Sequence, residues 1–314
     1  MERGIICLGE ALIDFIPKNA TNLVYEKCPG GAPANVAVGL AKLGVDTTFL
    51  GKVGDDVLGR FLKQTLKDYK VDVSQMVLSS EAKTGLTFVT LDKNGERSFD
   101  FYIEPRADQL LREDELEKGL FEKQRILHFG SISLIHEPSR GATKQAIRLA
   151  KQEGLKLSFD PNIRMSLWEN EQQARETILE VLPNVDILKI SEEELAFITG
   201  KRDIEEGILA CSEFEIPLIF VTCGAEGSIV FSEKASLSVP AMKIEAVDTT
   251  GAGDAYVSGM LFGLSQVEGE LRSITEKEME RVGQFASVSG ALAASQKGAM
   301  TALPELSEVK EFLE

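Results

Sequence analysis

Residues 248–259 read DTTGAGDAYVSG, and the apolar residues that follow continue a helical pattern. The glycines therefore lie where a loop turns into a helix, and without side chains they let the backbone approach a ligand closely. The amides of Gly251, Ala252 and Gly253 would face an anion, which the helix dipole also favours. Asp254 follows at the start of the helix, where a carboxylate can take a proton from a substrate hydroxyl. Taken alone, the same pattern also fits a turn with an aspartate as helix N-cap.

This segment differs from two common glycine-rich nucleotide motifs. The G-x-G-x-x-G fingerprint of dinucleotide-binding proteins requires a third glycine, and Tyr256 occupies that position here. No Walker A sequence occurs in the chain. The sequence therefore excludes an ordinary P-loop kinase and contains no dinucleotide fingerprint at this segment.

A second glycine-rich segment lies far upstream, where Gly30 and Gly31 precede a helical run. Asn35 falls in the first turn of that run, and its amide offers both a donor and an acceptor, which suits a sugar hydroxyl. Pro33 near the start and Gly44 just past the end are typical of helix boundaries. Taken alone, this pattern also fits an ordinary helix start with a capping asparagine.

Short apolar runs that resemble β-strands alternate with helical patterns along most of the chain. Several runs are continuously apolar, as expected of strands buried on both faces of a parallel sheet. This order predicts an α/β fold, a doubly wound and mostly parallel sheet with helices on both faces. The candidate strands are residues 5–8, 47–50, 126–129, 156–159, 185–190 and 218–222, and the candidate helices are 34–43, 56–70, 141–153, 170–182 and 204–213.

Residues 11–30 and 84–104 interrupt this alternation, because they contain strand-like runs with no helix between them. Asn94-Gly95 separates two such runs and is a strong hairpin signal. We infer a small, mostly antiparallel sheet formed by two insertions, although a hairpin extension of the main sheet also fits. The expected small β domain comprises 11–33 and 84–104, and the large α/β domain comprises 1–10, 34–83 and 105–314. Phe99, Phe101 and Ile103 alternate along the second run, and large apolar residues on the outer face favour a homodimer formed through this sheet.

The composition restricts the partners of the protein. At pH 7 the formal net charge is −16, so no overall field attracts nucleic acid or an anionic membrane, and we expect neither as a partner. The four cysteines are scattered without a C-x-x-C pair, and no apolar stretch reaches the ~18 residues of a membrane span. Without a signal-peptide pattern, these features predict a cytoplasmic enzyme with reduced thiols. The two histidines argue against a His-rich metal site.

Together, the two glycine-rich segments resemble, in order and spacing, the paired signatures of the ribokinase-like (PfkB) carbohydrate kinases. The resemblance covers essentially the whole chain and extends to GEALID at 9–14, VTCGAEG at 221–227 and KGA at 297–299. It implies a ribokinase-like fold with a small β-sheet lid. It also implies that ATP and a small sugar are the substrates of a phosphoryl transfer.

The resemblance assigns roles to residues around the sugar. Asp254 matches the catalytic base, and the glycine loop before it matches the anion hole that Gly251, Ala252 and Gly253 form. Asp14 matches a carboxylate that grips vicinal sugar hydroxyls, although it also fits a turn at a strand end. The other residues expected to contact the sugar are Gly30, Gly31 and Asn35.

The resemblance also assigns a nucleotide side and two cation sites. The residues matched to the nucleotide are Thr222, Gly224, Gly227, Lys189 and Gly298, although a tight turn between strands would also explain the glycines at 224 and 227. Glu194 matches a residue that acts on Mg²⁺ through water, but Ser191 replaces the asparagine that many relatives carry three positions earlier. An acidic first helical turn also explains the glutamates there. A monovalent cation, K⁺ in relatives, is implied at Asp248, Thr250, Ala293 and Thr301, with Gly298 in the same set.

The substrate is the least determined feature. Segments at 129–135, 106–111 and 160–164 resemble those of fructokinases, which implies fructose and its conversion to fructose 6-phosphate. The Asp-x-Asn-x-Arg run at 160–164 also occurs in 2-keto-3-deoxygluconate kinases. Arg164 suits a phosphate or an acidic substrate, and it also fits a surface ion pair. A 2-keto-3-deoxygluconate kinase, a ribokinase and a non-catalytic sugar-binding regulator remain alternatives.

Overall fold

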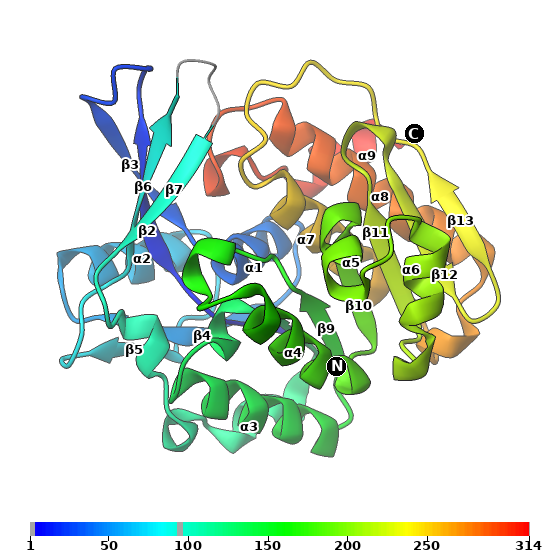
Figure 1. The fold of residues 1–314 in the computed structure, drawn as a ribbon, viewed down its shortest axis with the longest axis horizontal. Helices are drawn as coiled ribbons and strands as arrows, with labels where there is room; N and C mark the ends of the chain where they lie inside the picture. The colour runs from blue at the N-terminus through cyan, green and yellow to red at the C-terminus, as the bar shows by residue number, and fades with distance from the viewer. Residues whose placement is uncertain (1–3, 93–96, 314) are drawn as a thin grey trace.

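The computed structural model describes residues 4–92 and 97–313, and their strands form two separate sheets (Figure 1). The large sheet has nine strands in the order β13-β12-β11-β10-β9-β8-β1-β4-β5, and the small sheet has four in the order β3-β2-β6-β7. The strands of the large sheet are β1 (Gly4–Leu8), β4 (Thr47–Gly54), β5 (Met76–Ser79), β8 (Gln124–Gly130), β9 (Lys156–Asp160), β10 (Ile187–Ser191), β11 (Leu218–Thr222), β12 (Ser228–Ser232) and β13 (Ser236–Val239). The prediction of a ribokinase-like α/β fold is confirmed.

The large sheet is parallel from β5 to β11, and only β12 and β13 run antiparallel at one edge. Successive side chains of β1 point to opposite faces of the sheet, and both faces are covered, which explains why the strand is continuously apolar. Ile5 and Cys7 pack in one core cluster, while Ile6 and Leu8 pack in another on the opposite face. The strand is therefore buried on both sides, as its composition predicted.

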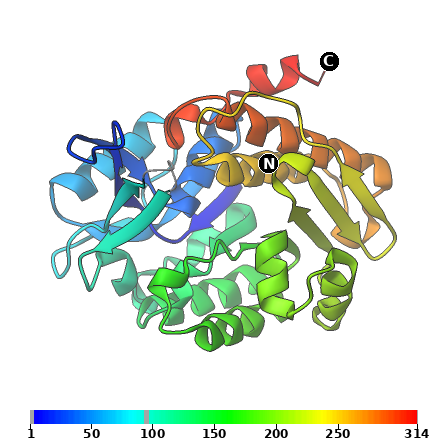
Figure 2. The same cartoon turned by 45° about the horizontal axis from the view of Figure 1, so that its top comes forward.

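Helices cover both faces of the large sheet, and the two layers lie on opposite sides of it in Figure 2. One layer contains α1 (Ala32–Lys42), α2 (Val57–Asp68), α7 (Ala252–Ser265) and α8 (Glu276–Ala294), with α9 (Leu306–Glu311) packed beside α8. The other layer contains α3 (Ser139–Gln152), α4 (Glu171–Val181), α5 (Glu192–Thr199) and α6 (Ile204–Ala210). The helix expected over 204–213 stops at Ala210, and a 3₁₀ turn over Ser212–Phe214 follows. None of the helices in the described part of the chain is both long and apolar enough to cross a membrane.

The small sheet stands at one side of the molecule, next to α1 and α2 (Figure 1). Its strands are β2 (Leu12–Pro17), β3 (Tyr25–Gly30), β6 (Leu86–Leu91) and β7 (Arg97–Tyr102). The pairs β2–β3 and β6–β7 are antiparallel, and β2–β6 is parallel. Because these strands form their own sheet, the alternative of a hairpin extension of the main sheet is wrong. The turn signal at Asn94-Gly95 lies outside the described residues, and the domain boundaries stay a prediction.

Asp56 fixes the start of α2 and joins it to the segment that enters the small sheet. Its carboxylate accepts hydrogen bonds from the backbone of Leu58 and Gly59, and from the backbone and hydroxyl of Thr84. Burial alone would raise the pKa of Asp56, but these four bonds together hold it below its ordinary value. The ionised form is therefore the one that stabilises the fold.

We expect Asp56→Ala to lower the free energy of unfolding by about 1–2 kcal/mol, the usual cost of losing an N-cap. Urea unfolding at pH 7 measures the loss. A lowered folded pKa gives stability that is present above the unfolded pKa and disappears as pH falls through the folded value. The difference between variant and parent should therefore shrink in acid, and a difference that grows in acid would contradict this account.

Candidate active site

A cavity of about 410 Å³ lies beyond the carboxyl ends of the parallel strands, and the small sheet forms part of its wall. This edge is where ligands bind in open α/β sheets. Residues from both sheets line it: Glu10, Leu12, Asp14, Gly31, Ala32, Asn35, Thr87, Phe101, Ile132, Asp160, Asn162, Arg164, Lys189, Thr249, Thr250, Gly251, Gly253 and Asp254. The two glycine-rich segments of the sequence therefore meet in one cavity.

Asp254 lies in the first turn of α7 and faces this cavity. Its Oδ2 accepts a hydrogen bond of 2.7 Å from Nδ2 of Asn35, in the first turn of α1. Burial raises the pKa of Asp254 to about 6, although the bond from Asn35 acts in the opposite direction. A carboxylate with this pKa is largely ionised at neutral pH and is still a better proton acceptor than an exposed one.

Asp14 belongs to the middle of β2, so the alternative of a turn residue is wrong. Gly30 of the neighbouring β3, which pairs with Leu12, lies against the carboxylate of Asp14: a methyl group on Gly30 would lie 2.1 Å from Oδ2 of Asp14. Burial raises the pKa of Asp14 to about 6, against the influence of Thr87 and Arg164. Gly30 therefore makes room for the carboxylate, while Gly31 lines the cavity itself.

Lys189 and Asp160 form an ion pair on the floor of the cavity. The Lys189 ammonium lies 3.1 Å from Oδ2 of Asp160, and both side chains are buried, Lys189 in the middle of β10 and Asp160 at the end of β9. Burial alone would lower the pKa of Lys189, but the charge of Asp160 raises it above its ordinary value, so the lysine is a cation. Lys189 also approaches the glycine loop, since a methyl group built on Gly253 would be 4.0 Å from its Nζ.

Sequence reasoning assigned no role to five polar residues of this cavity, which are Glu10, Thr87, Asp160, Asn162 and Thr249. Glu10 and Asp160 had a usable signal, since Asp160 is the last residue of a buried parallel strand and Glu10 follows another such strand by two positions. Thr87 had none, because its position depends on the register of β6 against β2, where it pairs with Asp14. Arg164 lines the cavity and donates to the carbonyl of Ile163, and it forms no ion pair with any of the described residues.

The glycine loop turns into α7 at Gly251, the N-cap, whose φ of 79° is readily adopted only by glycine. Ala252 is the first helical residue, and Gly253 lies between it and Asp254. A methyl group on Gly251 would lie 3.2 Å from the backbone of Ala299. The chain thus brings the start of α7, with its positive dipole end, to the cavity wall, and the amide of Ala252 there donates to the carbonyl of Thr249 at 3.2 Å.

The expected nucleotide residues Thr222, Gly224 and Gly227 lie at the end of β11 and in the turn to β12. Thr222 is level with Ser191 of the neighbouring β10, so this turn is at the same edge of the sheet as the cavity. Gly227 is also required by packing, because a methyl group there would be 2.1 Å from the carbonyl oxygen of Val239. The tight turn that was considered for these glycines is therefore present, and its position at this edge is compatible with a role in nucleotide binding.

Glu194 and Ser191 form a capping box at the start of α5. The Ser191 hydroxyl accepts from the amide of Glu194 at 3.1 Å, and Oε2 of Glu194 accepts from the amide of Ser191 at 3.0 Å. Oε1 of Glu194 accepts from the amide of Ile163 at 2.7 Å. The serine thus caps the helix, and each carboxylate oxygen of Glu194 accepts one hydrogen bond, while its charge helps to raise the pKa of Lys189.

The residues expected around a monovalent cation come from two loops that the structure joins. Asp248 accepts from the amide of Thr250 at 2.9 Å and from the amide of Gly298 at 3.2 Å. The amide of Asp248 in turn donates to the carbonyl of Ala294, next to Ala293 at the end of α8. Thr301 lies beyond Gly298, with its hydroxyl directed to the carbonyl of Lys297. In the described ranges, no group of three or more His, Cys, Asp or Glu side chains gathers as a metal site.

The model of the pfkB family of carbohydrate kinases matches residues 2–306. The chain belongs to this family.

Similar proteins agree with this kinase assignment. A probable chloroplastic fructokinase-6 of Arabidopsis thaliana is 44% identical over 98% of this chain and 82% of its own length. A double mutant of fructokinase from Vibrio cholerae O395, with fructose, ADP and a potassium ion bound, has a TM-score of 0.91 and 40% identity over 100% of this chain and 99% of its own. Aminoimidazole riboside kinase from Salmonella enterica has a TM-score of 0.87 and 31% identity over 99% and 100% of the two chains.

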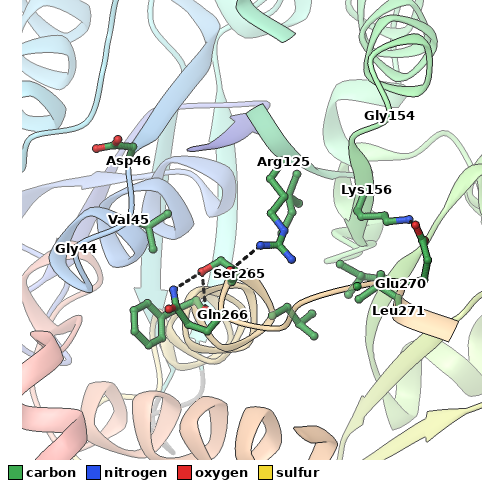
Figure 3. A pocket seen from close by; sticks show the side chains of 15 residues that line it. Gly44, Val45, Asp46, Arg125, Gly154, Lys156, Ser265, Gln266, Glu270 and Leu271 are labelled. Atoms are coloured by element: carbon green, nitrogen blue, oxygen red, sulfur yellow. Dashed lines mark hydrogen bonds and ion pairs between the residues drawn. The ribbon is translucent and has the colours of Figure 1, made fainter. Parts of the chain in front are cut away.

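This kinase has another cleft, of about 550 Å³, at the opposite edge of the large sheet (Figure 3). Arg125 points across it to the C-terminal end of α7 and donates to the carbonyls of Ser265 and Val267. Lys156 is paired with Glu270 at 2.8 Å. Because both cations are engaged and the glycine loop and Asp254 lie at the other end of α7, this cleft does not belong to the catalytic site.

Proposed function

We propose that this kinase transfers the γ-phosphoryl group of ATP to the primary hydroxyl at carbon 6 of fructose. The observation that carries the proposal is one cavity that is lined by Asp14 of the small sheet and by Asp254 and the glycine loop at the start of α7. One carboxylate can hold the sugar while the other activates its hydroxyl. The fructokinases among the similar proteins support fructose as the acceptor.

In this mechanism the sugar lies between the two sheets. Asp14 accepts hydrogen bonds from two sugar hydroxyls, and Gly31 and Asn35 bound the same space. Asp254, held in orientation by Asn35, takes the proton of the primary hydroxyl as that oxygen attacks the γ-phosphorus. The amides of Gly251, Ala252 and Gly253, the dipole of α7 and the cation of Lys189 stabilise charge on the phosphoryl oxygens.

The nucleotide would extend from the start of α7 along the ends of β10 and β11. Thr222, Gly224, Gly227 and Gly298 bound this side. A magnesium ion needs few protein ligands here, because it is held mainly by phosphate oxygens and water. Glu194 fits such a role through water, since its two oxygens each accept one hydrogen bond and keep further lone pairs. When bound, the ion neutralises phosphate charge; positioning and proton transfer belong to the protein.

The loops at 248–250 and 293–301 fit a monovalent cation such as K⁺. They are tied together by Asp248, and the donor set would be backbone carbonyls with one carboxylate, the oxygen ligands that a hard cation takes. The potassium ion in the Vibrio cholerae structure supports the proposal. The residues that would hold it are Asp248, Thr250, Ala293 and Thr301, with Gly298 beside them.

The small sheet would act as a lid over the sugar. Closure excludes water from the γ-phosphate, so ATP hydrolysis without sugar should be slow. Coupled ADP detection with fructose, ribose, glucose and 2-keto-3-deoxygluconate as acceptors tests the function. Fructose should give the highest kcat/KM. A preference for 2-keto-3-deoxygluconate would favour the alternative that the exposed Arg164 suits, a preference for ribose would favour a ribokinase, and no ADP with any sugar would indicate a non-catalytic regulator.

The base should set the acidic limit of activity. Burial raises the pKa of Asp254 to about 6, and only the ionised carboxylate can accept a proton. We therefore expect kcat for fructose to rise with pH through about 6 and to level off above it. A pH–rate profile at saturating ATP and fructose measures this limb. A limb centred near pH 4 would indicate a solvent-exposed carboxylate and would contradict the geometry.

We also propose that two copies associate through the outer face of the small sheet. Phe88 stacks on Phe15 with ring centroids 4.8 Å apart and meets Tyr25 and Tyr102 edge-on at 5.3 and 5.1 Å. Tyr102 is 53% exposed in one chain. We expect Tyr102→Glu to convert a dimer into a monomer in light scattering, while Leu209→Glu, at a 72% exposed site on α6, leaves the dimer intact. A monomeric parent protein would contradict the proposal.

A cytoplasmic location is proposed as well. Its support is that all four cysteines are free, which suits a reducing compartment. Cell fractionation of the native protein tests it.

A further inference from the structure

A second, much smaller cavity lies directly behind the candidate active site. Its volume is about 10 Å³, close to the minimum of about 10–15 Å³ that one water requires. Glu10, Asp160 and Asp254 line both this space and the sugar cavity. The full lining is Glu10, Ala32, Pro33, Val36, His128, Gly130, Ser131, Ile132, Asp160, Pro161, Asn162 and Asp254.

Two buried polar atoms in this wall lack a protein partner. Within the described part of the chain, Oε2 of Glu10 and Oγ of Ser131 make no hydrogen bond to the protein. The two residues are 4% and 0% exposed. Oδ1 of Asn35, whose amide nitrogen holds Asp254, is a third such atom at the edge of the sugar cavity. Buried polar groups without a protein partner are normally satisfied by an ordered water, which makes about three hydrogen bonds.

The orientation of Glu10 is fixed by its other oxygen. Oε1 accepts from the amide of Ala32 at 3.2 Å, at the start of α1, so Oε2 is the atom left for the small cavity. On its far side lie the buried Asp108 and Arg106, 3.3 Å apart, whose charges act on Glu10 in opposite directions. Burial is the largest influence and raises the pKa of Glu10 to about 7.

The other titratable groups at the small cavity, His128 and Asp160, already have interaction partners in the protein. Burial lowers the pKa of His128 to about 3, so its ring is neutral, and its Nδ1 lies 3.0 Å from the hydroxyl of Ser158. Asp160 is paired with Lys189. Glu10 is therefore the carboxylate that can exchange a proton with Asp254 across this space.

We propose that one water in the small cavity bridges Glu10, Ser131 and Asp254, and that the proton taken from the sugar passes through it to Glu10. This inference rests on the proposed function. The O–H bond of the sugar hydroxyl breaks as its oxygen bonds to the γ-phosphorus, and the bond from that phosphorus to ADP breaks. Asp254 receives the proton and gives it to the water, and the water gives one of its own to Oε2 of Glu10. Asp254 is then ionised again, and Glu10 releases the proton to solvent after the product leaves.

Burial raises the pKa of both carboxyls toward neutrality, that of Glu10 to about 7 and that of Asp254 to about 6, so Glu10 can accept the proton that Asp254 releases. Glu10 acts through Asp254 and not on the sugar, which makes it a positioning residue for the proton. Its loss should therefore change turnover and leave fructose binding intact.

Glu10→Gln tests this role with little change of shape, because the amide oxygen can still accept from Ala32. We expect kcat to fall about 10- to 100-fold, at or below the range for losing a direct acid–base group, with the KM for fructose changed less than about 2-fold. The proton inventory in mixed H₂O and D₂O should be curved for the parent and linear for the variant. Ser131→Ala should lower kcat in the same direction, whereas Ser289→Ala, a matched change at an equally buried site on α8, should not.

Stability separates this role from a structural one. A carboxyl whose folded pKa is raised contributes stability below its unfolded pKa and loses it as pH rises through about 7. At pH 8 the neutral variant should therefore have a Tm at least equal to that of the parent. Lower kcat with an unreduced Tm supports the relay.

Two results would overturn it. One is a kcat within about 2-fold of the parent for both Glu10→Gln and Ser131→Ala. The other is a high-resolution crystal structure of the fructose complex with no water between Glu10 and Ser131, which remains decisive if the Glu10 variant fails to fold. Either result, with fructose-dependent ADP release intact in the parent, removes only the relay. A parent without that release removes the proposed function.

Discussion

Asp254→Asn is expected to reduce kcat for fructose phosphorylation by about 10²–10⁴-fold, which corresponds to about 3–5 kcal/mol of activation free energy. The amide has nearly the shape of the carboxylate, and its oxygen can still accept the hydrogen bond that Asn35 donates. It cannot accept the hydroxyl proton. Fructose binding should therefore be almost unchanged. Single-turnover kinetics gives the chemical rate, and calorimetry gives the affinity for the sugar.

Asp68→Asn is the matched control, because it makes the same chemical change at the exposed end of α2. It should leave kcat and KM at parental values. If Asp254→Asn turned over fructose at the parental rate, Asp254 would not be the base. If it lost activity only because fructose no longer bound, its role would be in binding.

Asp14→Ala is expected to weaken fructose binding by about 10²-fold or more, since it removes a charged acceptor from two hydroxyls and each such bond is worth about 1.5–3 kcal/mol. Alanine should fit at position 14, because the change only removes the carboxylate that lies against Gly30 and adds no atoms. The KM for ATP should change little, since we propose that the nucleotide binds along the ends of β10 and β11 in the large sheet. Initial rates over a fructose series at saturating ATP measure the effect.

Asp100→Ala is the control within the same sheet, at an exposed position of β7 two residues from Tyr102. It should leave the KM for fructose unchanged. An Asp14→Ala enzyme whose KM for fructose stayed within about 2-fold of the parental value would show that the sugar does not bind to this carboxylate.

Six of the nine strands of the large sheet could be predicted because their information is local, whereas β5, β12 and β13, at or next to the edges of the sheet, were not among the candidates. A strand such as β1, apolar at every position, signals burial on both faces wherever it lies in the chain. The small sheet could also be predicted from local sequence. Two strand-like runs without a helix between them cannot form a parallel crossover unit, so they indicate antiparallel pairing. Some helix ends differ by a few residues from the predicted ones, as at Ala210, because the last turn of a helix depends on tertiary contacts.

The candidate site was less accessible to sequence reasoning, since it is assembled from distant segments. The bond between Asn35 and Asp254 joins residues 219 positions apart, and no local pattern gives that pairing. The position of Thr87 beside Asp14 depends on strand register. Ser191 replaces the asparagine that many relatives carry, and the structure shows that its hydroxyl caps α5, because a hydroxyl is among the best N-cap groups.

The cavity wall is shared between two sheets that the chain builds from different segments. Asp14, Thr87 and Phe101 lie on the small sheet, whereas Asp254 and its glycine loop lie at the start of α7, a helix packed against the large sheet. A change in which sugar is accepted can therefore arise on the small sheet without disturbing the phosphate chemistry at the start of α7. A few substitutions in the small sheet can therefore change the acceptor sugar while the residues of phosphoryl transfer stay the same. Directed evolution at positions 87 and 101 would test which other sugars the enzyme can accept.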